Sequence, residues 1–402
     1  MNLLSLAERW GDALTSVSLG FAMERCLHTA DKFSTCTSCY DVCPIHAIQP
    51  GGPPTLMVES CQQCRACVPV CPTGAFAAVD EAQNLLSCTQ RASAQSCELV
   101  CGLNPNVALG DASVDTAVRV RGCLAGLGMG VYLGLASQGV EKVVVRLDAC
   151  ADCPWQALQP RVVAQVEQAQ ALLGLWGRAD MFSSLETEQG DWRKRPYCNV
   201  GAPPVSRRDL FRWRDDEKKS AGEPEANTQT SQYHERLRFL RAIKQLQPCQ
   251  ESGDNISLAG LNFALVVVSN TCTACGACAR ACPTGALHLE TADSCFQLVF
   301  APQICIACGM CAHVCAPGAL SLTPDPAFAQ VFGTAAEQVV QQGSLVTCSN
   351  CRTPFAAGSE AKLCPVCEFR RQHPFGSILP PELAASRLKR KVIPSGGTNR
   401  DH

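Results

Sequence analysis

Hydrophobic and polar positions in the middle of the chain alternate in blocks that predict strands and helices in turn. Apolar runs at 117–120 and 142–147 have the length of strands, and residues 122–140 between them carry no charge. This uncharged stretch is rich in glycine and contains polar residues, so we interpret it as a buried helix and not as a transmembrane segment. An amphipathic helical pattern follows at 156–176. The order strand, helix, strand, helix predicts a small α/β domain with parallel strands over 81–180.

The periodicity disappears after this domain. Residues 181–250 are charged and rich in proline, which predicts a linker. Within it, 231–246 has apolar residues at helical spacing and predicts an amphipathic helix. The apolar run 258–269 then predicts a buried strand at the entrance to a further module.

Composition narrows the class of protein. The chain has 402 residues with a hydrophobic content of 47 %, so it can bury a core in two or three domains. The formal net charge of −2 and the lack of a lysine-rich tract argue against a nucleic-acid partner. The 29 cysteines occur mainly as C-x2-C groups, which indicates metal ligands in a reducing compartment and therefore a cytoplasmic location.

The densest chemistry lies in two repeated segments of the form C-x2-C-x2-C-x3-C, at 272–282 and 305–315. Four thiolates this close in one loop cannot all form disulfides with acceptable geometry. They can bind an iron–sulfur cubane, because each thiolate ligates one iron corner. The intervening residues are mostly small, as a backbone that curls around a cluster requires.

This segment resembles bacterial two-cluster ferredoxins over residues 251–325. The resemblance implies a small α+β unit with two pseudo-symmetric halves, in which the fourth cysteine of each half ligates the other cluster. The implied ligands of the two [4Fe–4S] clusters are Cys272, Cys275, Cys278 and Cys315 for one, and Cys305, Cys308, Cys311 and Cys282 for the other.

The same pattern recurs in residues 1–80, so a whole module is repeated. One cluster is expected on Cys61, Cys64, Cys67 and Cys43. The other half departs from the pattern, because Phe33 stands where its first cysteine should be. Three alternatives are open for the site that retains Cys36, Cys39 and Cys71: Cys26 is the fourth ligand, the site holds a three-iron cluster, or it is degenerate. We favour Cys26.

The α/β domain carries its own cysteines. Parallel strands would place Cys123, Cys150 and Cys153 at one edge of the sheet, and Cys88, Cys97 or Cys101 could complete a four-thiolate site. The segments R-V-R-G-C-L and V-V-V-R-L-D-A-C resemble the iron–sulfur delta subunit of methyl-viologen-reducing hydrogenases. That resemblance implies a [2Fe–2S] cluster associated with Cys88, Cys123, Cys150 and Cys153. A redox-active dithiol at Cys150 and Cys153, or zinc, are the alternatives.

Residues 326–402 end the chain with two C-x2-C knuckles and a flexible tail. Two facing knuckles form a tetrahedral four-sulfur site, which suits structural zinc better than rubredoxin-type iron. The predicted ligands are Cys348, Cys351, Cys364 and Cys367.

The sequence therefore predicts an α+β chain with two 2[4Fe–4S] ferredoxin-like modules flanking a small α/β domain, followed by a zinc-ribbon-like region. We expect an iron–sulfur electron-transfer protein of polyferredoxin type. It would relay electrons at low potential from a hydrogenase, formate dehydrogenase or flavoenzyme to a heterodisulfide-type reductase. The alternatives are a thiol or disulfide reductase that uses Cys150 and Cys153, or a cluster-based redox sensor. Whether the protein is itself an enzyme is left open, although an electron carrier or electron-transfer subunit fits the sequence better.

Overall fold

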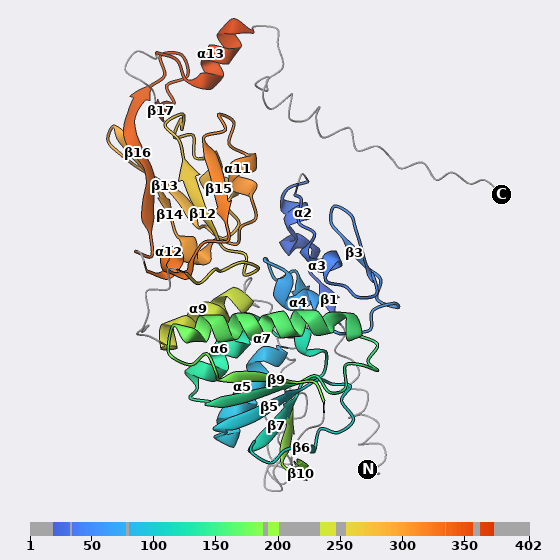
Figure 1. The fold of residues 1–402 in the computed structure, drawn as a ribbon. Helices are drawn as coiled ribbons and strands as arrows, with labels where there is room; N and C mark the ends of the chain where they lie inside the picture. The colour runs from blue at the N-terminus through green and yellow to red at the C-terminus, as the bar shows by residue number, and fades with distance from the viewer. Residues whose placement is uncertain are drawn as a thin grey trace, which may run out of the picture. The chain divides into compact units, whose positions relative to one another are not determined.

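The computed structural model describes residues 19–32, 34–77, 80–187, 192–200, 234–246, 255–333, 335–356 and 362–373. Its contacts divide the chain into two compact units, Met1–Ile256 and Ser257–His402. Each unit contains a cysteine-rich module of short helices and strands (Figure 1).

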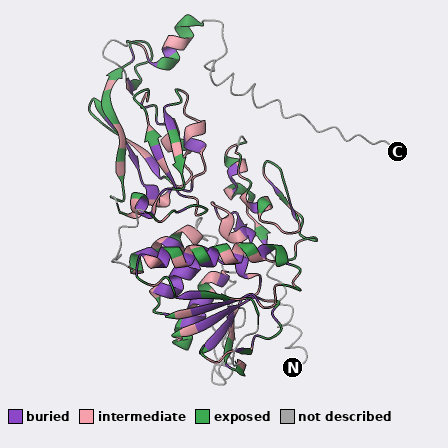
Figure 2. Ribbon diagram, in the orientation of Figure 1, coloured by how far each residue is buried: buried purple, intermediate pink, exposed green. Residues whose placement is uncertain are grey.

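The first unit is built on a five-stranded sheet whose strands all run parallel. Their order across the sheet is β11-β7-β5-β8-β9. These strands are β5 (Ser96–Val100), β7 (Thr116–Arg119), β8 (Lys142–Arg146), β9 (Phe182–Leu185) and β11 (Tyr197–Asn199). Figure 2 shows the central strands buried, as expected for apolar runs in a parallel sheet covered on both faces.

The helices of this domain are α5 (Glu81–Ala92), α6 (Met129–Ser137), α7 (Gln159–Gly174) and α9 (His234–Leu246), with the short 3₁₀ turns η2 (Leu124–Gly126) and η3 (Gln156–Leu158). Met129 to Ala136 of α6 are all buried, which confirms a buried helix in the second half of the uncharged stretch 122–140, whereas its first half forms the cysteine turn and η2. Nowhere in the described part of the chain does a helix combine the length and hydropathy needed to cross a membrane.

The α/β domain extends beyond the boundary predicted at residue 180. Strands β9 and β11 belong to its sheet, and β10 (Trp192–Lys194) pairs with β6 (Leu109–Asp111). The amphipathic helix predicted at 231–246 is present as α9, but it packs on α6, where Glu235 Oε1 accepts a hydrogen bond from the Gly130 N–H at 2.6 Å. Residues 182–185, 192–199 and 234–246 of the predicted linker 181–250 are therefore parts of the domain, while 188–191, 201–233 and 247–250 lie outside the described residues.

The N-terminal module contains two short antiparallel pairs, β1 (Gly20–Phe21) with β4 (Phe76–Ala77) and β2 (Ile48–Gln49) with β3 (Thr55–Leu56). Its helical turns are η1 (Met23–Arg25), α2 (Leu27–Ala30), α3 (Ser38–Asp41) and α4 (Cys67–Val70). The small core packs the Phe21 and Phe76 rings 4.9 Å apart between the cysteine loops.

The second unit repeats this order of elements. The outer strands β12 (Ala264–Val268) and β15 (Leu320–Pro324) pair, β13 (Leu287–Ala292) and β14 (Cys295–Phe300) form a hairpin, and α10 (Ala277–Ala281) and α11 (Met310–His313) follow the cysteine loops. The strand predicted as buried over 258–269 is shorter and lies at an edge, where Val267 is 55 % exposed. The remaining elements are η4 (Pro302–Ile304), α12 (Phe328–Phe332), β16 (Gln338–Thr347), β17 (Pro354–Ala356) and α13 (Pro365–Gln372).

The module does not end at the predicted residue 325. Strand β16 pairs with β14 on one side and with β17 on the other, which makes a four-stranded sheet β13-β14-β16-β17. The sheet is continuous from the ferredoxin-like hairpin to the C-terminal knuckles.

Candidate metal centres

The cysteine loops of the second unit share one backbone conformation. After Cys272, the second and fourth residues, Ala274 and Gly276, have φ of 54° and 67°. After Cys305, Ala307 and Gly309 have φ of 53° and 75°. Left-handed residues in such turns aim successive N–H groups into one concavity, which is an anion-binding arrangement found at iron–sulfur sites. Glycine suits such a position because it adopts a left-handed backbone without the steric cost of a Cβ atom.

The same loops bring the predicted ligands together. One hollow is lined by Cys272, Cys275, Cys278 and Cys315. Burial, with repulsion from the neighbouring thiolates, raises the pKa of Cys278 to about 11. Burial and the charges of Cys305, Cys308 and Cys282 raise the pKa of Cys311 to about 12. In each predicted set, the four cysteines thus lie close together, including the one that comes from the other half of the module. A cationic centre would offset the repulsion among their thiolates.

The half of the N-terminal module that begins at Cys61 has the same loop. Gln63 and Arg65 occupy the two left-handed positions, with φ of 57° and 66°. Burial raises the pKa of Cys67, and the charges of Cys64, Cys61 and Cys43 raise it further. The four predicted ligands Cys43, Cys61, Cys64 and Cys67 therefore form one set.

The half that contains Phe33 folds differently. Phe33 itself lies outside the described residues, and none of residues 34–43 has a positive φ; instead the helix α3 begins at Ser38. Two hydrogen bonds hold the loop, from Tyr40 Oη to the Cys36 carbonyl at 2.9 Å and between His28 Nε2 and the same oxygen at 2.7 Å. This loop therefore lacks the left-handed residues of the other three half-modules, and a fourth thiol beside Cys36, Cys39 and Cys71 would have to come from another segment.

That segment is the turn between η1 and α2. Cys26 is buried and lines a hollow together with Cys36, Cys39 and Cys71. Burial raises the pKa of Cys39 to about 12, and the charges of Cys36, Cys71 and Cys26 contribute to that rise. The arrangement matches the favoured alternative, in which Cys26 supplies the fourth thiolate.

The α/β domain brings four other thiols together at the carboxyl ends of its central strands. Cys101 follows β5, Cys123 follows β7, and Cys150 and Cys153 follow β8. Burial raises the pKa of Cys123 to about 12 with contributions from Cys101 and Cys150, and it raises the pKa of Cys150 to about 11 with contributions from Cys101 and Cys153. The chain crosses from one side of β5 to the other between β7 and β8, so this set lies at the topological switch point, where open α/β sheets bind ligands.

Cys88 is not part of that set. Its thiol, on α5, interacts with Cys198 and with the Arg91 guanidinium, whose Nη2 lies 3.3 Å from the Cys88 Sγ. Cys97 is fully buried within β5. Among the three candidates for the fourth position, the structure therefore places Cys101 at the site. The signal for it was the segment Ser96–Val100, a strand that the charged Glu98 conceals in the sequence and that Cys101 directly follows.

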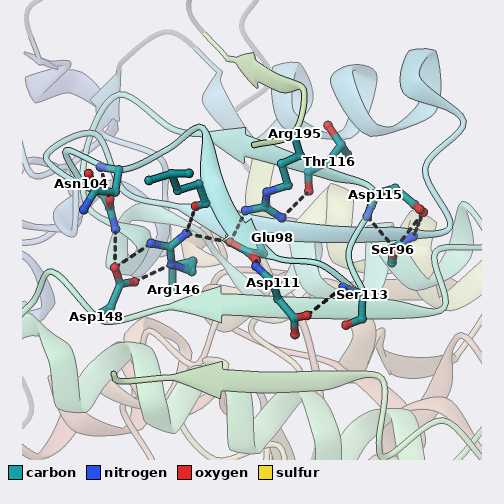
Figure 3. Close-up of polar contacts among 12 residues, drawn as sticks. Ser96, Glu98, Asn104, Asp111, Ser113, Asp115, Thr116, Arg146, Asp148 and Arg195 are labelled. Atoms are coloured by element: carbon teal, nitrogen blue, oxygen red, sulfur yellow. Dashed lines mark hydrogen bonds and ion pairs between the residues drawn. The ribbon is translucent and has the colours of Figure 1, made fainter. Parts of the chain in front are cut away.

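A buried charge network fixes the two loops that carry Cys101 and Cys150 (Figure 3). Arg146, on β8, donates to both Asp148 carboxylate oxygens at 2.6 and 2.7 Å and to Glu98 Oε2 at 2.9 Å. Asn104 Nδ2 donates to Asp148 at 3.2 Å from the Cys101 loop, and Arg195 pairs with Glu98. Two carboxylates and two guanidiniums balance in charge, so the network can be buried and still hold both loops.

The C-terminal knuckles form a more compact site. The sulfur atoms of Cys348, Cys351, Cys364 and Cys367 all lie within 4.8 Å of one another, and those of Cys351 and Cys364 are 3.7 Å apart. Tetrahedral zinc with bonds of about 2.3 Å separates its sulfur ligands by roughly 3.8 Å, so the set fits a single ion. Backbone N–H groups of Cys351 and Cys364 lower the pKa of Cys348 to about 6, which favours its thiolate. No other set among the described residues is this compact, as expected if the remaining cysteine sets hold clusters and not single ions.

Comparison with protein families agrees with the two repeated modules. A family model described as a 4Fe-4S dicluster domain matches residues 271–319, and one described as a 4Fe-4S binding domain matches residues 54–77. A search of curated proteins found no match. The chain thus contains two ferredoxin-type 4Fe-4S domains, within a fold of mixed helices and strands.

Proposed function

We propose that the protein is an electron-transfer protein of polyferredoxin type. Each ferredoxin-type module would hold two [4Fe–4S] clusters, with Cys26 as the ligand that replaces position 33. Iron–sulfur clusters accept single electrons with little ligand movement, so a series of them conducts electrons. The observation that carries the proposal is the left-handed loop conformation shared by three half-modules, which in one of them borders a hollow ringed by four cysteines.

We propose a further cluster on Cys101, Cys123, Cys150 and Cys153. In this set Cys101 takes the place of Cys88, which the resemblance to the hydrogenase subunit implies. The resemblance to the hydrogenase delta subunit favours [2Fe–2S] at this site. A single zinc ion fits less well, because these four sulfur atoms are not as compact as the C-terminal set. We assign zinc to Cys348, Cys351, Cys364 and Cys367 as a structural ion.

The donor is proposed to be a low-potential hydrogenase, formate dehydrogenase or flavoenzyme, and the acceptor a reductase of the heterodisulfide type. The proposal is tested by anaerobic iron, sulfide and zinc analysis combined with a redox titration followed by electron paramagnetic resonance. We expect about sixteen irons in the modules and about two more in the α/β domain, all reversibly reducible at low potential. Fewer than about eight irons, or no reversible reduction, would refute the proposal.

A thiol or disulfide reductase is the second candidate, and one feature favours it. The turn between Cys150 and Cys153 is open to solvent at Ala151 and Asp152, so a small disulfide could reach these thiols. In that case the double variant Cys150→Ala/Cys153→Ala would lose turnover of a disulfide substrate and keep the module clusters. If the double variant loses iron and the parent protein turns over no disulfide, Cys150 and Cys153 are cluster ligands instead.

A further inference from the structure

The N-terminal ferredoxin-type module and the α/β domain meet at two of the proposed ligands. The backbone N–H of Cys123 donates a hydrogen bond to the carbonyl oxygen of Cys64 at 3.2 Å. Cys64 belongs to the set completed by Cys43, Cys61 and Cys67, and Cys123 belongs to the set at the switch point of the sheet. The charge of Cys64 also contributes to the raised pKa of Cys123, after burial and the contributions of Cys101 and Cys150.

Two glycines allow this close approach. A Cβ atom on Gly122 would lie 2.9 Å from the Cys64 carbonyl oxygen and 3.3 Å from that of Gln63. A Cβ atom on Gly126 would lie 3.2 Å from the Arg65 Cβ. Side chains at these positions would push the cysteine turn of the α/β domain away from the ferredoxin loop.

A buried ion pair holds the two loops in contact. Arg65, in the ferredoxin loop, pairs with Glu81 at the start of α5, and the two residues are only 7 % and 9 % exposed. Glu81 Oε1 also accepts a hydrogen bond from the Arg121 N–H at 3.0 Å, directly before the cysteine turn. Separating the two loops would break this pair and leave each charge without its partner, which costs free energy. The ion pair therefore stabilises the contact.

We infer that this contact is an electron-transfer bridge from the N-terminal module to the α/β domain. The inference rests on the proposed function. The bridge runs from the Cys64 sulfur along its own backbone to the carbonyl, across one hydrogen bond to the Cys123 amide, and on to the Cys123 sulfur. With a centre bound at each set, one electron passing over the bridge would oxidise one centre and reduce the other. No atom or proton moves across the bridge.

The first experiment measures whether the two centres are neighbours. In fully dithionite-reduced protein, paramagnetic resonance of the α/β-domain centre should be broadened by the spin of the centre on the Cys64 set. In Cys67→Ser preparations whose iron analysis shows a loss of about four irons, the signal should sharpen, because the neighbouring spin is then absent. The variant Cys198→Ser serves as control, because Cys198 belongs to no four-cysteine set. A spectrum that is the same in the parent protein and in Cys67→Ser would overturn the inference.

The second experiment tests the bridge itself with matched glycine substitutions. Gly122→Ala should slow electron equilibration between the centre on the Cys64 set and the α/β-domain centre after pulse reduction of part of the centres, because electronic coupling falls steeply as the loops separate. Gly174→Ala should have no effect, since its new Cβ would meet only the Ala179 Cβ at 3.9 Å. We expect a rate difference of roughly tenfold in rapid-freeze kinetics at equal iron content. Equal rates in both variants would refute the bridge but not the proposed electron-transfer function. Centres that no reductant reduces would refute the electron-transfer function itself.

Discussion

Replacing Arg146 by methionine should destabilise the α/β domain and loosen its cysteine site. The Arg146 side chain is fully buried and donates to Asp148, to Glu98 and, at 2.8 Å, to the Leu109 carbonyl. Its guanidinium also lies 4.3 Å from the centre of the Trp192 ring. Methionine has nearly the same length, so the substitution removes the charge and the donors with little loss of packing.

The size of the effect follows from what remains around the two carboxylates. Breaking a buried ion pair from one side costs about 3–5 kcal/mol. Glu98 would keep Arg195 and the Asp111 N–H at 3.0 Å, and Asp148 would keep Asn104, so the low end of this range applies. A loss of about 3 kcal/mol raises the equilibrium constant for opening of the domain roughly 150-fold.

Native-state hydrogen exchange with mass spectrometry, under anaerobic conditions, measures this quantity for individual strands. Amide protection in β5 and β8 should fall by the stated factor, while protection in the second unit should not change. The control is Arg371→Met, since Arg371 pairs with Glu368 at a side-chain exposure of 68 % and should change stability by less than about 0.5 kcal/mol. Unchanged protection of β5 and β8 in Arg146→Met would show that the network does not hold this part of the sheet.

Three further predictions concern the metal content. Cys26→Ser should leave the N-terminal module with one defective cluster, detected as a three-iron signal in the oxidised protein or as a loss of about four irons; unchanged iron would mean that Cys26 is not a ligand. Cys101→Ser should remove the iron of the α/β domain and Cys88→Ser should retain it, so equal iron contents would contradict the choice of Cys101. A chelator should withdraw about one zinc per chain and leave the iron content unchanged. It should also lower amide protection in β17, because the zinc joins two knuckles at the end of one sheet. Release of iron together with zinc would argue against a separate structural site.

Local spacing made the ferredoxin-type halves predictable. Cys272, Cys275 and Cys278 lie in one loop, so their number, spacing and small neighbours already restrict the backbone to a curl around a common centre. The buried helix α6 and the strand β8 were equally predictable from the sequence, because the length and pattern of their apolar residues fit few other structures. The domain boundaries at 180 and 325 were placed wrongly, since β11 and β16 are short or polar strands that are recognised only through their partners in a sheet.

The amino-acid sequence by itself determined which cysteines lie in C-x2-C loops, the repeat of the module, and the order of β7, α6 and β8, in which the two strands run parallel. The tertiary structure decided how distant residues meet, most clearly for Cys101, which the sequence left open alongside Cys88 and Cys97. Cys26 reaches its partners because β1 pairs with β4, and Cys101 reaches Cys123 because β5 is the central strand. The contact of Cys64 with Cys123 likewise depends on two domains packing together. Spacing along a chain restricts residues within one loop, whereas proximity between loops depends on sheet order and on buried contacts such as the pair of Arg65 and Glu81.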